Sequence, residues 1–125
     1  MRRILLACIL LTATCTAITH HAVAQAPTVS ASEFTAKTNT LDAQLASGDT
    51  IAAKATFDAI HQLMLQELAV TKNNIENAST ADRPAISSVM HNQTVIYKNI
   101  WALKTNLAAN RSQIHTKLSQ FVATF

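Results

Sequence analysis

Apolar residues recur every three or four positions along most of the chain after residue 30. The longest such series, with one threonine in it, is Phe57, Ile60, Met64, Leu68, Thr71 and Ile75. Side chains three and four positions apart lie on the same face of an α-helix. The spacing therefore predicts a long helix with one apolar face. We expect it to begin after Asp49, whose carboxylate can cap it, and to end near Asn77.

A shorter helix is predicted before this one, beginning near Ser30 or Ser32. Its apolar stripe consists of Phe34, Leu41 and Leu45. Gly48 marks its end, because glycine readily adopts the left-handed backbone conformation found just beyond helix C-termini.

A third helix is predicted after the break at residues 78–84, with Pro84 in its first turn, where proline is tolerated. Its seam repeats every seven residues and comprises Ile86, Gln93, Ile100 and Leu107. The second and third helices would each have about 28 residues, or roughly 42 Å, and form an antiparallel hairpin. Gln93 interrupts the apolar seam, and we expect it to fix the register of the helices through a buried hydrogen bond.

A fourth, shorter helix is predicted after Asn110, which forms a capping pair with Gln113. A straight continuation of the third helix would leave the large side chains of the tail in water, at about 1.5–3 kcal/mol each. These are Ile114, Leu118, Phe121 and Phe125. We therefore favour a chain that folds back near Asn110, with a second subunit covering the tail as the alternative. The predicted fold is all-α, a small antiparallel helical bundle with a long hairpin and shorter N- and C-terminal helices.

The first 24 residues show a different pattern, in which two arginines precede an apolar run from Ile4 to Ile18. The triplet Ala22-Val23-Ala24 then supplies the small residues that a signal peptidase accepts. The apolar run is shorter than the ~20 residues needed to span a bilayer. We expect a cleaved signal peptide at 1–24, a flexible leader at 25–29 and a single helical domain at 30–125. The protein would then be periplasmic or extracellular in a bacterium, with no membrane span after cleavage.

Cleavage would also remove most of the apparent chemistry and part of the charge. Both cysteines, Cys8 and Cys15, and the adjacent pair His20 and His21 lie in the signal segment. The whole chain has 10 Lys+Arg and 7 Asp+Glu, and loss of Arg2 and Arg3 leaves 8 − 7 = +1. The remaining charges are scattered singly, so neither nucleic-acid binding nor polybasic membrane binding is expected.

The mature part of the chain offers little for catalysis or metal binding. A single glycine cannot build a phosphate-binding loop, and no nucleophile elbow is present. In a hairpin that turns near residue 80, His61 lies opposite residue 99 or 100 and about 13 Å along the axis from His91. Asp58 can contact His61 as a surface pair, and His115 lies farther along the chain. We expect no enzyme, no cofactor and no metal.

Two stretches, FDAIHQLMLQELAVTKNNI and IYKNIWALKTNLAANRSQIHTKLSQF, resemble short, uncharacterised secreted α-helical bacterial proteins. The resemblance implies a helical fold and an exported protein, and it assigns no functional residue.

Several apolar residues lie off the predicted seams, which is more than a thin bundle needs. Tyr97 and Trp101 could rim a binding groove, although packing with a polar tip at the surface is their commoner role. The candidate interaction surface comprises Leu65, Val95, Tyr97, Trp101, Phe121 and Phe125. We predict a non-catalytic, chaperone-like module that binds an unknown protein or itself. The alternative is a four-helix carrier of a ligand, haem or metal that uses His61 or His115.

Overall fold

The computed structural model describes residues 28–125, which form four α-helices and one short 3-10 helix. The helices are α1 (Ala31–Ser47), α2 (Thr50–Asn77), α3 (Arg83–Ala102) and α4 (Arg111–Val122), with η1 (Lys104–Asn106) between the last two. No strand occurs in the described part of the chain, so the predicted all-α bundle is confirmed. The predicted signal peptide lies outside the described residues.

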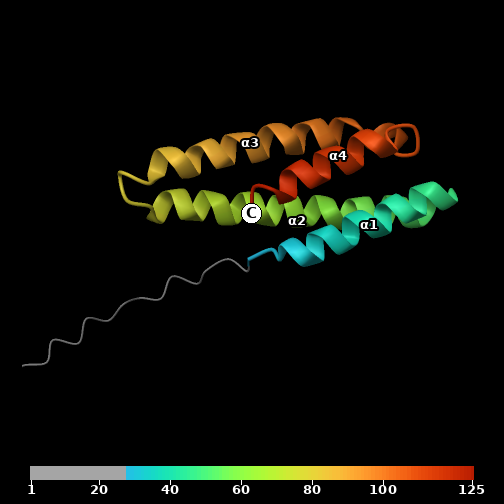
Figure 1. Ribbon diagram of the computed structural model, residues 1–125, viewed down its shortest axis with the longest axis horizontal. Helices are drawn as coiled ribbons and strands as arrows, with labels where there is room; N and C mark the ends of the chain where they lie inside the picture. Colours follow the sequence, from blue (N-terminus) through green and yellow to red (C-terminus); the bar gives the residue numbers. More distant parts are fainter. Residues whose placement is uncertain (1–27) are drawn as a thin grey trace, which may run out of the picture.

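The four helices form a four-sided bundle in which each helix has two neighbours (Figure 1). α1 packs against α2 and α4, and α3 packs against the same two helices. All four contribute buried apolar side chains to one core, which comprises Val29, Phe34, Leu41, Leu45, Ala53, Phe57, Ile60, Met64, Ile100, Ile114, Leu118 and Phe121. Val29 belongs to this core, although the sequence placed it in a flexible leader.

The ends of α1 and the start of α2 lie where the sequence predicted them. Ser30 Oγ accepts a hydrogen bond from the Glu33 N–H (3.5 Å) and caps α1. Gly48 follows α1 with a φ of 78°, the left-handed conformation expected of it. Asp49 Oδ1 accepts from the Ala52 N–H (3.0 Å) at the start of α2. Local capping chemistry therefore sets the α1–α2 turn.

α3 is shorter than predicted, with 20 residues in place of about 28. It ends at Ala102 without a glycine or proline, and the chain then reverses through η1. Two asparagines replace part of the lost helical hydrogen bonding: Asn106 Oδ1 accepts from the Ala109 N–H (3.1 Å), and Asn110 Nδ2 donates to the Leu103 carbonyl oxygen (3.3 Å). The reversal buries the apolar face of α4, so the chain folds back, although α3 ends before Asn110.

The two long helices extend beyond the two short ones (Figure 1). α1 has 17 residues and α2 has 28, or about 26 and 42 Å. α4 is the other short helix. Thr124, just after α4, accepts a hydrogen bond at Oγ1 from Gln93 Nε2 of α3 (3.2 Å), so the C-terminus lies level with the middle of α3. We call the uncovered part the hairpin end, defined as residues 68–77 of α2 and 83–90 of α3.

Candidate interaction surface

The hairpin end carries large apolar side chains that are only partly buried. They are Leu68, Ile75, Ile86, Val89 and Met90. They continue the seams of α2 and α3 past the point where α1 and α4 end, so α2 and α3 cover each other there and nothing else in the described chain covers them. The predicted seam residues Leu68 and Ile75 are therefore only partly buried, whereas Glu67 and Val70 are buried.

A buried polar layer lies where the hairpin end meets the four-helix core. Gln93 is fully buried, and Glu67 and Thr71 are 8% and 4% exposed. The predicted buried hydrogen bond of Gln93 is made to Thr124 at the C-terminus, while its Oε1 atom has no hydrogen-bond partner. Burial raises the pKa of the Glu67 carboxyl, and the nearby Gln93 side chain acts in the opposite direction. This layer stops the apolar core short of the hairpin end.

Four rings stack between α2 and α3 on the other side of this layer. The His61 ring lies parallel to the rings of Tyr97 and Trp101, with centroid distances of 5.6 and 4.1 Å. A hydrogen bond joins His61 Nε2 to Tyr97 Oη (2.9 Å). Trp101 also stacks on Phe57, at 6.3 Å. His61 therefore lies between residues 97 and 101, the level predicted for it, but its hydrogen bond goes to Tyr97 and not to Asp58.

Phe121 and Phe125, two of the predicted surface residues, form a different cluster with Phe34. Phe121 is fully buried and stacks on Phe34 with ring centroids 5.5 Å apart. Phe125 lies edge-on to both rings and is 40% exposed. Phe121 is thus a core residue that no partner can reach, because the chain reversal places α4 against α1.

The other predicted surface residues are divided between two faces. Leu65 and Val95 are 39% and 44% exposed. Leu65 is four residues from His61 and lies on the same face of α2 as the ring stack. Val95 is two residues from Tyr97, about 200° around α3, and points away from it. Only Leu65, Tyr97 and Trp101 share one face, so the six residues do not make a single surface.

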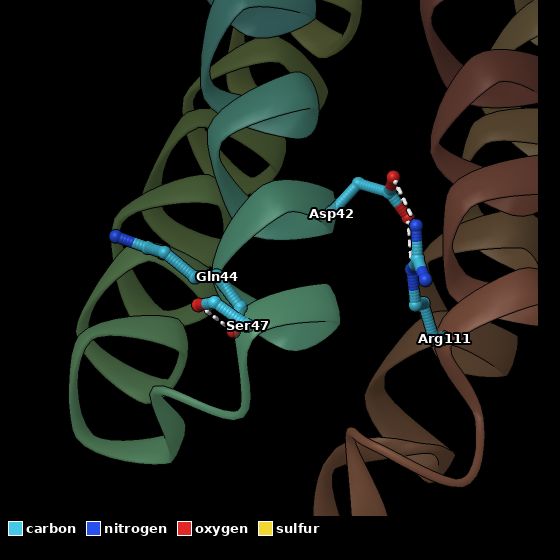
Figure 2. Close-up of polar contacts among 4 residues, drawn as sticks. All are labelled: Asp42, Gln44, Ser47 and Arg111. Carbon is cyan, nitrogen blue, oxygen red and sulfur yellow. Dashed lines mark hydrogen bonds and ion pairs between the residues drawn. The ribbon is translucent and has the colours of Figure 1, made fainter.

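An ion pair joins α1 to α4 on the opposite side of the bundle (Figure 2). Arg111 donates from Nε to Asp42 Oδ1 (2.7 Å) and from a terminal nitrogen to Oδ2 (2.8 Å). The Arg111 hydrogen bonds lower the pKa of Asp42. The Gln44 side chain points away from this pair, and the main-chain carbonyl oxygen of Gln44 accepts a hydrogen bond from Ser47 Oγ (3.0 Å). The pair spans 69 residues of sequence, so no local pattern could have revealed it.

A hollow of about 450 Å³ lies beside this ion pair, with His115 in its wall. Because Asp42 neutralises the guanidinium charge of Arg111 in a bidentate contact, the pair offers a second anion little electrostatic attraction. We interpret the pair as a structural ion pair that links the two short helices, α1 and α4.

Between residues 28 and 125, no three His, Cys, Asp or Glu side chains converge so that they could hold a metal ion. The residues Cys8, Cys15, His20 and His21 lie outside the described part. Within that part, no helix has the length and apolar character needed to cross a membrane.

The chain matches no protein-family model, no curated protein sequence and no solved structure.

Proposed function

We propose that this protein is a non-catalytic, exported helical module that binds other proteins, in a chaperone-like manner, through the hairpin end. The observation that supports this role is the set of partly buried apolar side chains on α2 and α3 beyond the reach of α1 and α4. Contiguous exposed apolar surface is typical of interaction sites. Polar residues such as the exposed Lys72–Glu76 ion pair lie beside this apolar surface and keep the hairpin end soluble in water.

The size of the hairpin end favours weak and reversible binding. Completing the burial of a partly buried aliphatic side chain contributes about 0.5 kcal/mol, well below the value for full burial. The five apolar residues of the hairpin end together supply about 2–3 kcal/mol before the entropic cost of association. Such a surface suits transient contact with exposed apolar segments of unfolded clients better than a permanent complex.

The test is suppression of aggregation by the mature chain. Light scattering of a denatured client, such as reduced insulin, should rise more slowly in its presence. The variant Ile86→Gln places an amide in the hairpin end and should lose most of this protection. The matched control is Ile51→Gln, which changes an isoleucine that is 85% exposed at the start of α2.

If the two variants have equal helix content by circular dichroism and protect the client equally, the hairpin end is not the binding surface. Sedimentation over a range of concentrations adds a second arm, because a dimer that Ile86→Gln abolishes would identify the partner as another copy of this chain. Export has its own test, since the protein recovered from the periplasm of its host should begin at Gln25.

The alternative, a haem or metal carrier, would use His61 or His115. His61 is stacked and hydrogen-bonded within the bundle, and His115 is exposed beside the contact of α4 with α1, near Asp42 and Arg111. No observation in the described residues favours this alternative, and a colour change or metal uptake by the purified protein would revive it.

A further inference from the structure

A second surface feature lies at the far end of the bundle from the hairpin end, where α3 gives way to η1. A hollow of about 340 Å³ opens there, at the lower end of the size range of small-molecule sites. Phe57, Trp101 and Leu107 give it apolar walls, and Lys54, Asp58 and Lys104 give it charged ones. We call it the Trp101 groove.

The Trp101 groove continues into a neighbouring hollow of about 240 Å³. Both hollows are lined by Lys54, Lys104 and Leu107, and the second adds Leu45 and Ala53. The two lysines therefore stand where the apolar surfaces meet, so one molecule lying across both hollows would meet apolar walls along its length and ammonium groups at its middle or end.

Lys54 and Lys104 have no carboxylate partner. The ion pairs among residues 28–125 are Lys72–Glu76 and Asp42–Arg111. Asp58 also lines the groove, which leaves two ammonium groups against one carboxylate and a local charge of 2 − 1 = +1. The groove thus holds positive charge beside apolar surface on a chain whose charges are otherwise scattered.

Trp101 brings the aromatic and the positive features together. His61 covers one face of the indole at 4.1 Å, and Lys104 Nζ lies 3.8 Å from the indole centroid. Two groups this close to one ring must lie on opposite faces, so Lys104 sits on the face that His61 leaves free. The ring attracts the ammonium through its quadrupole. A carboxylate that accepts a hydrogen bond from Lys104 would bring its own apolar body against Leu107 and the part of Trp101 that lines the hollow.

We propose that the Trp101 groove binds a small amphipathic carboxylate, with its carboxylate between Lys54 and Lys104 and its apolar body on Phe57, Trp101 and Leu107. The charge pattern selects an anion, and the walls select an apolar body over a small inorganic ion. This site is separate from the hairpin end and stands or falls independently of the proposed function.

The test uses decanoate as the probe and Trp101 as the reporter, because the chain contains one tryptophan. Decanoate should change the fluorescence of Trp101 saturably, whereas acetate and decyltrimethylammonium, which lack the apolar body or the negative charge, should not. The double variant Lys54→Gln/Lys104→Gln should weaken binding about tenfold, because two charged contacts are lost. The matched control Lys37→Gln/Lys117→Gln removes the same charge from α1 and α4 and should bind as tightly as the unmodified chain.

Asp58→Asn provides an independent check with the opposite sign. Removal of the one carboxylate in the groove should tighten decanoate binding about two- to threefold, because a like charge is lost. Nuclear magnetic resonance of the unmodified protein should show shifts at the Trp101 indole N–H and none at the hairpin end. Equal binding of decanoate and decyltrimethylammonium, equal effects of the two lysine pairs, or shifts at the hairpin end without shifts at Trp101 would each overturn the proposal.

Discussion

Glu67 shows how one residue at the edge of the core can set the pH dependence of stability. Burial raises the pKa of its carboxyl above the ordinary value of 4.5. The folded protein therefore holds the Glu67 proton more tightly than the unfolded chain does. The stabilisation is fully present below about pH 4.5 and is lost as the pH rises through the raised pKa.

Glu67→Gln should remove the loss of stability at rising pH, because glutamine keeps the shape of the side chain and carries no charge. We expect the variant to be more stable than the unmodified protein at pH 7, on the order of 1 kcal/mol, or a few degrees in Tm. Urea unfolding between about pH 5 and 8 checks this, because Asp42, whose pKa is lowered, stays ionised there. Parallel stability curves for the two proteins would contradict it.

Among the elements, the α1–α2 turn depends on the backbone of Gly48. Its φ of 78° is unfavourable for residues with a Cβ atom, yet an added Cβ would meet no atom within 4 Å. Gly48→Ala should therefore destabilise the protein by about 1 kcal/mol through backbone strain alone. Gly48→Asn should cost less, because asparagine tolerates the left-handed region. A lower urea midpoint for Asn than for Ala would show that another interaction governs the turn.

The α3–α4 connection illustrates an element boundary that periodicity could not predict. The seam of α3 continues to Leu107, and no glycine or proline interrupts it, yet α3 ends at Ala102. The polar side chains of Asn106 and Asn110 satisfy backbone groups in the reversal, and burial of α4 against α1 and α3 stabilises it. The asparagines were a visible signal, but only the distant apolar faces decided where the chain turns.

At the scale of the molecule, Phe34 links the first and last helices. It is fully buried, and it contacts both Phe121 and Phe125. Phe34→Ala should cost about 3–5 kcal/mol, because it leaves a cavity between α1 and α4. That is a large part of the 5–15 kcal/mol typical of a domain. Phe125→Ala, at a residue that is 40% exposed, should cost clearly less. Equal urea midpoints for the two variants would show that the cluster carries little of the stability.

The hairpin end should also open more readily than the rest of α2. Its apolar side chains lack the cover of α1 and α4, and few buried contacts oppose local opening. Amide hydrogen exchange should therefore be faster for residues 72–77 and 83–90 of the hairpin end than for residues 53–64. Uniform protection along α2 would mean that α2 and α3 open only together with the whole bundle, or that a second chain covers the hairpin end.

The helical class, the caps at Ser30, Gly48 and Asp49 and the level of His61 along the hairpin could be predicted from the sequence, because they depend on local spacing and on nearby side chains. The tertiary structure alone decided the burial of Phe121 and Glu67, the early end of α3 and the Asp42–Arg111 ion pair. Each of these depends on which helix face meets which across many residues of chain. It also decided the two candidate sites, since each consists of side chains that lie together only after the bundle has closed.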